Sequence, residues 1–347
     1  MPIDLQHIAE KVAHRLSALD FAQLWPEFHP YRFALYDEDT VFFNGAFFPR
    51  TADFVGNTAI VYKGEHIAIW NLTEEPDVDV LSAKIVHEMF HAFQQECGEK
   101  RFANEFEAIL KYQNSVELLA LRCEENRILS SLCAAFEEVA FTRLLSLRKL
   151  RMQQYPYEYA YESCIEAIEG AAQFVELSAL RALNAEKHAQ ALARLQARLS
   201  SVDSLLPARV ACYDSGAAML LACAAGGRTL PRSLGKETAV FYQALIDSAP
   251  LPGHPVSVSD AVAEYFKADQ AALQARFARA FQHPLSFPAD AVVKCFNVYG
   301  PRKLGPHILS EYFLMIQAPD AAPTVLNGDF VFRMDDLGRL TELYQII

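Results

Sequence analysis

The stretch KIVHEMFHAFQQE, residues 84–96, carries three side chains whose types and spacing can do chemistry. His87 and His91 are four positions apart, so in a helix their imidazoles lie on one face, one turn apart, and can bind the same metal ion. Glu88 would lie beside that metal, where its carboxylate can take a proton from water. This H-E-x-x-H pattern predicts a zinc site on a helix. The alternative is a solvated helix face that carries these residues by coincidence.

A catalytic zinc site needs a third protein ligand and an open fourth position. The sequence offers Glu169 in IEAIEGAAQFVE, where Gly170 interrupts an otherwise favourable helix. Glycine inside a helix costs about 1 kcal/mol relative to alanine, so we expect it to have a packing reason. Our hypothesis is close approach to the H-E-x-x-H helix, which would bring the carboxylate to the metal. Glu105 or Glu107 in NEFEAI is the alternative ligand, but that stretch has no comparable packing reason.

The segments HEMFHAFQ and EGAAQFVE, the latter at 169–176, resemble the gluzincin metallopeptidases with a peptidase-MA-like domain. This resemblance implies that Zn²⁺ is bound by His87, His91 and Glu169. It also implies that Glu88 acts as the general base in peptide hydrolysis. The linear match covers only residues 57–95, 160–180 and 211–221.

The resemblance includes a Tyr-x-x-Gly-Ala element that opens a later helix, here Tyr213 to Ala217. In aminopeptidase-like gluzincins this tyrosine donates to the oxyanion of the tetrahedral intermediate, and the resemblance implies the same role for Tyr213. The alternative for Tyr213 is a core tyrosine at a helix start. The family fold further implies that an edge strand such as HIAIWN, residues 66–71, pairs with the peptide substrate.

The sequence departs from the compact members of that family in two respects. Glu169 follows His91 by 78 positions, so the helices predicted at 104–152 would be an insertion between the two active-site helices. Gln173 occupies the position at which compact relatives carry an aspartate that orients a zinc histidine. Glu162 and Glu176 share a helix face with Glu169 at seven-residue spacing, and either is a candidate to orient a ligand. The alternative for this acidic cluster is a solvated helix face, and we favour it for Glu166 and, by a small margin, for Glu162.

The order of the predicted elements gives an α+β fold. A first helix at 3–20 precedes β-branched and aromatic runs between 31 and 72, and TAIVYKGEHIAIW reads as a hairpin. We therefore expect a small antiparallel or mixed sheet at residues 1–76 as part of the catalytic unit. A helical catalytic core is expected at 77–225, with an insertion at about 100–156, and a mixed helix and strand region at 226–347.

Composition narrows the functional classes. The 347 residues carry a formal net charge of −12, and an acidic surface repels phosphate backbones, so we expect no nucleic-acid partner. The absence of a long apolar run predicts no membrane span, and the N-terminus resembles an amphipathic helix rather than a signal peptide. Seven scattered cysteines without a C-x-x-C pair favour reduced thiols in the cytoplasm. The basic stretch RLLSLRKLRMQQ, 143–154, is expected on a solvated helix face, where it pairs with the neighbouring glutamates.

Together these features predict a cytoplasmic zinc metallopeptidase acting on a peptide or protein substrate. Two other hypotheses remain open from the sequence. In one, the chain binds zinc but is catalytically inactive and serves as a binding or regulatory protein. In the other, it is a helical interaction protein without a metal.

Overall fold

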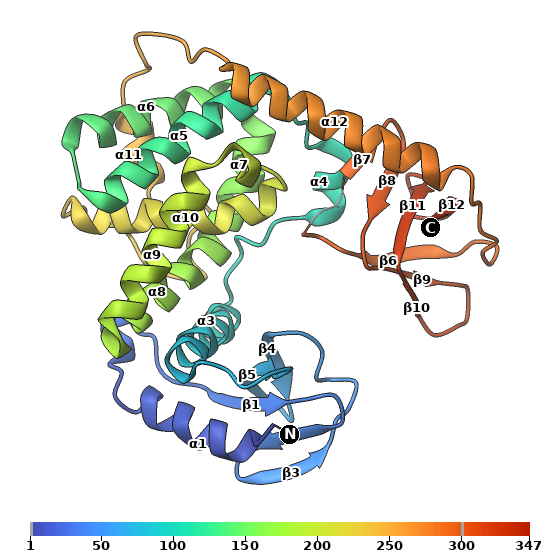
Figure 1. Cartoon of the computed structure of the whole chain (residues 1–347), viewed down its shortest axis with the longest axis horizontal. Helices are drawn as coiled ribbons and strands as arrows, with labels where there is room; N and C mark the ends of the chain where they lie inside the picture. The colour runs from blue at the N-terminus through green and yellow to red at the C-terminus, as the bar shows by residue number, and fades with distance from the viewer. Residues whose placement is uncertain (1–2, 300–301) are drawn as a thin grey trace.

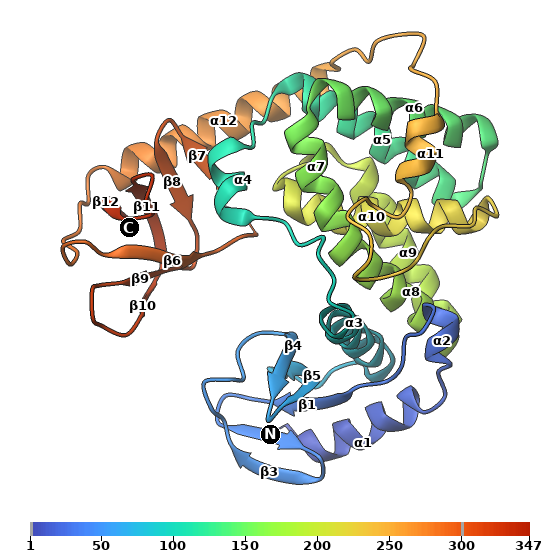
Figure 2. The ribbon, with the colours of Figure 1, turned by 180° about the vertical axis from the view of Figure 1, so that it is seen from behind.

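The computed structural model describes residues 3–299 and 302–347 and has an α+β fold (Figures 1 and 2). An N-terminal helix and sheet, a helical body and a C-terminal strand-rich unit follow one another along the chain. Among the described residues, no helix is long and apolar enough to cross a membrane.

The N-terminal unit is built on a mixed five-stranded sheet whose order is β3-β2-β1-β5-β4. β1 and β5 are parallel, and the other pairs are antiparallel. Helix α1 buries one apolar stripe against this unit, as its spacing predicts. The elements are α1 (Leu5–Leu16), α2 (Phe21–Leu24), β1 (Arg32–Tyr36), β2 (Thr40–Phe43), β3 (Ala46–Pro49), β4 (Thr58–Tyr62) and β5 (Glu65–Asn71).

The predicted hairpin forms, but its edge strand is not the one that we expected. Lys63 and Gly64 make the turn with positive φ angles of 51° and 84°, and β4 pairs with β5 over its whole length. The HIAIWN strand, β5, is bonded on both sides, by β1 and by β4, so it has no free edge for a peptide. The free edge beside the zinc-motif helix belongs to β4, because the parallel pairing of β1 with β5 moves β5 into the sheet.

Helix α3 (Val78–Glu96) carries the H-E-x-x-H motif and lies between the sheet and the helical body (Figure 1). It begins at Asp77, whose side chain accepts hydrogen bonds from the amides of Asp79 and Val80. It ends before Gly98, which has the left-handed φ of 66° typical of a helix stop. One face packs on β5 and the other on α8, so α3 is buried on two sides.

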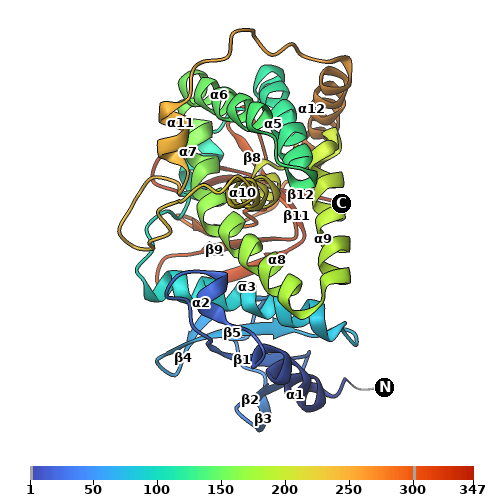
Figure 3. The same ribbon diagram turned by 90° about the vertical axis from the view of Figure 1, so that its left-hand side faces the viewer.

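The helical body surrounds α10, which Figure 3 shows end-on in its centre. The sequence predicted one or two helices at 104–152, whereas the structure forms three there. The helix predicted near 213 begins earlier, at Ala208, which places Tyr213 in its second turn. The elements are α4 (Glu105–Lys111), α5 (Val116–Ala134), α6 (Glu138–Gln154), α7 (Pro156–Ile165), the π-helical turn η1 (Glu166–Gly170), α8 (Ala171–Leu183), α9 (Ala185–Ser200), the 3₁₀ turn η2 (Val202–Ser204), α10 (Ala208–Ala225) and α11 (Gln243–Ser248).

The C-terminal unit has its own apolar core and begins beyond helix α12 (Asp260–Ala280). β11 and β12 form a hairpin near the C-terminus, joined by a turn in which Gly338 has a φ of 74°. Residues 234–249 instead pack into the main core, through Leu234, Phe241 and Ile246 among others. The strands form two sheets, β10-β9-β6 and β12-β11-β8-β7, from β6 (Val292–Phe296), β7 (Arg302–Leu304), β8 (His307–Ser310), β9 (Phe313–Gln317), β10 (Thr324–Asn327), β11 (Asp329–Met334) and β12 (Leu340–Ile346).

Candidate metal centre

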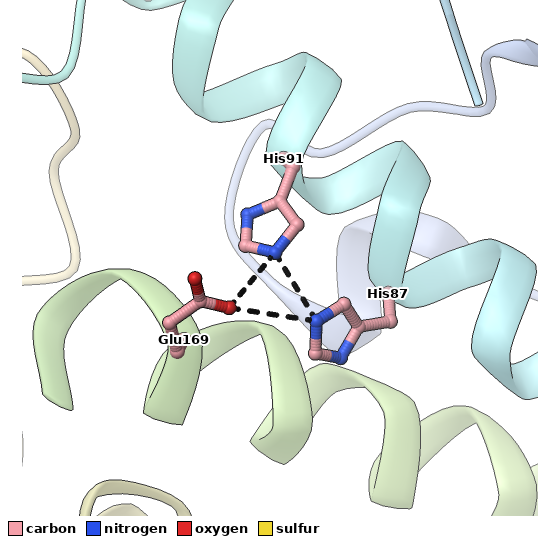
Figure 4. A group of neighbouring side chains, drawn as sticks. All are labelled: His87, His91 and Glu169. Carbon is pink, nitrogen blue, oxygen red and sulfur yellow. Dashed lines mark hydrogen bonds and ion pairs between the residues drawn. The ribbon is translucent and has the colours of Figure 1, made fainter. Parts of the chain in front are cut away.

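His87, His91 and Glu169 bring one ligand atom each to a common point (Figure 4). The two imidazole Nε2 atoms are 3.1 Å apart, and Glu169 Oε2 lies 3.2 Å from His91 Nε2 and 3.9 Å from His87 Nε2. Tetrahedral zinc with bonds of about 2.0–2.1 Å holds its ligand atoms about 3.3 Å apart. The spacing of the three atoms therefore fits a zinc ion, and among the described residues this is the one cluster of His, Cys, Asp and Glu with such geometry.

The hydrogen bonds around the imidazoles determine which ring nitrogen faces the cluster as an acceptor. The Gln94 amide nitrogen donates to the Ile168 carbonyl at 3.0 Å, so its Oε1, 2.8 Å from His91 Nδ1, must accept. His91 Nδ1 is therefore the protonated nitrogen. Glu176 Oε2 lies 3.1 Å from His87 Nδ1, and a carboxylate can only accept, which gives the same tautomer.

In neutral imidazoles these tautomers leave both Nε2 atoms with lone pairs that point at each other and at Glu169 Oε2. Three converging acceptors repel one another unless a cation or a proton lies among them. Metal-binding histidines in proteins characteristically donate their second N–H to a carboxylate or a carbonyl, as His87 does to Glu176 and His91 does to Gln94. The donor set and its supporting partners both fit zinc.

The charges of Glu169 and His91 affect each other's pKa values when no metal is bound. Burial alone would lower the pKa of His91, but the hydrogen bond and negative charge of Glu169 raise it above its ordinary value. Burial conversely raises the pKa of Glu169. The hydrogen bond and charge of His91, together with the charge of His87, outweigh the effect of burial, so the pKa of Glu169 is lowered. Without a metal, a proton on His91 takes the place of the cation among the three acceptors.

A π-helical turn aims Glu169 at the histidines. Residues 166–170 form η1 between α7 and α8, and such single π turns inside helices are frequently found at functional sites. One carboxylate of the turn, Glu169, reaches the cluster on α3, while another, Glu166, receives two hydrogen bonds from Arg148 at 2.6 and 2.8 Å. Because Glu166 is 2% exposed, this bidentate contact fixes the turn from behind.

The glycine beside the ligand does have a packing reason, but we expected the wrong partner. A Cβ atom on Gly170 would lie 2.6 Å from the Cα of Gly216 on α10, not against α3. A Cβ on Gly216 would in turn lie 2.9 Å from the Cα atoms of Gly170 and Glu166. The Glu-Gly and Tyr-x-x-Gly-Ala elements therefore cross at their glycines. This crossing sets the position of the turn that carries Glu169, and through it the reach of the carboxylate to α3.

Two cavities meet at the cluster, and His87, Glu88 and Tyr213 line both of them. The first, about 470 Å³, also contains the carboxylates of Glu105 and Glu169, and we call it the acidic cavity. The second, about 400 Å³, contains Lys84, Arg194 and Arg198, and we call it the basic cavity.

Glu88 is 8% exposed, yet it lies at the junction of the two cavities. Its carboxylate takes part in no ion pair or hydrogen bond with a side chain of residues 3–299 or 302–347. A buried carboxylate without a protein partner is costly unless it faces a ligand or solvent. The position predicted for the general base is therefore free to bond water or substrate.

Tyr213 lies on the wall of both cavities, half-buried, on α10. Burial and then the negative charge of Glu169 raise the pKa of its hydroxyl well above the ordinary value. The hydroxyl therefore remains protonated and can act as a donor. Tyr299, from the loop after β6, lines the same acidic cavity and brings the C-terminal unit to the site.

Glu105, the alternative third ligand, lies in the acidic cavity but is held away from the two imidazoles. Arg209 forms ion pairs with Glu105 and, at 3.0 Å, with Glu169 Oε1, so the guanidinium bridges the two carboxylates. The hydroxyl of Tyr161 donates to Glu105 at 2.7 Å. Glu107, the other alternative, pairs with Lys111 on the surface of α4. Sequence patterns gave no signal for Arg209, because its partners come from α4 and η1.

The charges behind the site contradict our surface assignment of residues 143–154. Arg148 and Arg151 are 1% and 2% exposed rather than solvated. Arg151 donates to both oxygens of Glu125 at 2.9 Å and pairs with Glu162. Glu162 and Glu166 are each 2% exposed, so the solvated face that we expected for them is wrong. Of the two candidates to orient a zinc histidine, Glu162 and Glu176, only Glu176 contacts the cluster.

Comparisons with protein-family models, with curated proteins and with solved structures found no match to this chain.

Proposed function

We propose that this protein is a zinc-dependent hydrolase that cleaves peptide bonds. The observation that carries the proposal is the convergence of one ligand atom each from His87, His91 and Glu169, with both imidazoles held in place by hydrogen bonds to Glu176 and Gln94. When bound there, zinc would act as a Lewis acid and lower the pKa of a water molecule. The fourth position would face the junction of the two cavities.

The side chains around that position supply the remaining steps. Glu88, which has no side-chain partner within the part of the chain that the structure describes, accepts the proton of the attacking water and then delivers it to the leaving amine. Tyr213, kept protonated, donates to the oxygen of the scissile carbonyl as negative charge develops on it. Arg209 neutralises Glu169 on the side away from the histidines, which holds its other oxygen toward the metal position. The family resemblance supports these roles.

Support for a peptide substrate comes from the sheet edge. β4 is the edge strand of the mixed sheet, and Asn57 and Thr58 at its beginning line the acidic cavity beside His87 and Glu88. An extended peptide bonded to β4 would lie alongside the motif helix, with its backbone near the proposed base. All seven cysteines are free, which supports our placement of the protein in the reducing cytoplasm.

The test is metal analysis combined with three substitutions. We expect about one zinc per chain in protein purified without chelator, and we expect Glu169→Ala to lose it while Glu105→Ala retains it. Glu88→Gln should keep the zinc and lose turnover on a panel of quenched fluorescent peptides. Zinc without activity in the wild type would favour a binding or regulatory protein. Absence of zinc from the wild-type protein after reconstitution would reject the proposal.

A further inference from the structure

The basic cavity stands out because it concentrates positive charge beside the proposed catalytic base of an acidic protein. The chain has 31 Lys and Arg against 43 Asp and Glu. Lys84 on α3 and Arg194 and Arg198 on α9 nevertheless share one cavity of about 400 Å³ with Glu88. The acidic cavity on the other side of Glu88 holds Glu105 and Glu169 against the single cation Arg209. A peptide substrate that extends past Glu88, the proposed general base, therefore passes from an acidic to a basic environment.

The three cations differ in how fully they are paired. Arg198 donates to both oxygens of Asp214 at 2.6 and 2.7 Å, and Lys84 is 3.7 Å from Glu176, which already accepts from His87. Arg194 takes part in no ion pair or side-chain hydrogen bond within the part of the chain that the structure describes. Gln190 and Arg198 lie one turn before and one turn after Arg194 on α9, so no acidic side chain of its own helix is adjacent to it.

The rest of the cavity wall is part polar and part apolar. Gln173, Glu176 and Tyr213 belong to the polar part. Trp70, Leu177 and Leu180 form the apolar part, and the Lys84 ammonium lies 5.8 Å from the centre of the Trp70 ring. The apolar part binds a hydrocarbon or aromatic body, while an unpaired guanidinium at the cavity recognises a planar anion. The cavity is thus suited to an amphipathic group with a carboxylate at one end.

We propose that the basic cavity is a substrate subsite that binds a residue carrying a carboxylate on one side of the scissile bond, with Arg194 as its main anchor. The carboxylate is either an acidic side chain or the α-carboxylate at the end of the peptide, which share this chemistry. The identity of the bound molecule as a peptide rests on the function proposed above, whereas the anion preference of the cavity does not.

The first experiment measures binding without activity. The zinc-free protein is titrated with 3-phenylpropanoate and with 3-phenylpropanamide, and binding is followed by calorimetry and by tryptophan fluorescence. Trp70 lines the cavity, while the only other tryptophan, Trp25, is fully buried, so a change in emission reports this site. Zinc is left out because a carboxylate would also bind the metal.

We expect the carboxylate to bind about fivefold more tightly than the amide, which is the upper end of the range for an exposed arginine–carboxylate contact. Arg194→Ala should remove the difference, and Arg194→Glu should reverse it in favour of 3-phenylpropylamine. Arg181→Ala, which removes an exposed charge of the neighbouring helix outside the cavity, should leave the preference intact. Equal binding of acid and amide, or no binding of either, would overturn the proposal.

The second experiment identifies the source of the carboxylate and uses zinc-loaded protein. Peptides that differ only in Glu against Gln near the cleavage point, or only in a free against an amidated C-terminus, are compared for kcat/KM. We expect one of the two pairs to show a kcat/KM ratio of about fivefold in the wild type that is lost in Arg194→Ala, and that pair identifies the source of the carboxylate. Selective binding without cleavage of any peptide would leave the subsite standing and reject the peptidase. Cleavage with neither preference would reject the subsite alone.

Discussion

The backbones of Gly170 and Gly216 cross so closely that a methyl group on Gly170 would lie 2.6 Å from the Cα of Gly216. This crossing joins the π turn that carries Glu169 to the helix that carries Tyr213. Two residues with proposed roles in the site, far apart in the sequence, are therefore positioned by one contact between backbones. Since neither partner is a flexible side chain, the contact cannot relax without moving a helix.

Gly170→Ala should force α10 and the π turn apart. We expect the free energy of unfolding to fall by about 1–3 kcal/mol or more, as for overpacked cores, and the zinc content to fall with it because Glu169 moves. Denaturant unfolding and metal analysis measure the two effects. Gly253→Ala is the matched control, since a methyl group there would contact nothing within 4 Å. Equal stability of the two variants would contradict the close crossing.

Glu176→Gln should weaken metal binding without removing a ligand. The Glu176 carboxylate accepts from His87 Nδ1 at 3.1 Å, and loss of such a partner typically lowers metal affinity by 10–100-fold. Competition with a chromogenic zinc chelator gives the affinity. Glu186→Gln, an exposed substitution on α9, should leave it unchanged. Unaltered affinity in Glu176→Gln would show that His87 does not depend on this contact.

Tyr213→Phe tests the donor to the oxyanion. The hydroxyl remains protonated because burial and the charge of Glu169 raise its pKa, so its loss should remove a donor rather than a base. We expect kcat to fall about 10²–10³-fold, as when one oxyanion donor is removed, with zinc content retained. Steady-state kinetics on a cleaved peptide give kcat and KM for the variant and the wild type. If KM rises while kcat is unchanged, Tyr213 binds substrate but does not stabilise the transition state.

Arg148→Ala should be far more damaging than its place in a basic stretch suggests. It would leave the Glu166 carboxylate, 2% exposed, without its bidentate partner, and breaking such a buried pair costs about 3–5 kcal/mol. Arg143→Ala is the control from the same helix. Arg143 pairs with Glu124 at 2.8 Å while its side chain is 59% exposed, and exposed pairs contribute about 0–1 kcal/mol. Denaturant unfolding should therefore separate the two variants clearly.

Asp79 gives the stability a defined dependence on pH. Hydrogen bonds from Lys187 lower its pKa to about 2, although burial opposes them, and bonds from Arg15 and Asn184 add to the effect. A carboxyl with a lowered folded pKa stabilises the fold above its unfolded pKa of about 3.8, and this contribution is lost as the pH falls toward 2. Asp79→Asn should therefore cost about 1–2 kcal/mol at pH 7 and much less near pH 2. A difference that does not vary with pH would contradict this.

Several parts of this architecture could be predicted from local sequence. The four-residue spacing of His87 and His91, the Asp77 cap and the Gly98 stop specify a helix with two imidazoles on one face, because helix geometry depends only on near neighbours. The Lys63–Gly64 turn similarly specifies the β4–β5 hairpin. The glycine at 170 indicated a close helix crossing, since a missing side chain inside a helix has a cost that packing must offset.

The tertiary structure alone decided which elements meet. The sequence around Gly170 does not indicate that its partner is Gly216 on α10 rather than the H-E-x-x-H helix. The sequence likewise does not indicate that β5 pairs with β1 as well as with β4, which makes β4 the edge strand. Arg148 and Arg151 look like surface charges along the chain, and they are buried only because Glu125, Glu162 and Glu166 arrive from other helices. Local periodicity depends on residues that are neighbours in the chain. The residue that pairs with a buried charge, or that packs against the backbone of a glycine, comes from a distant segment and is known only from the tertiary structure.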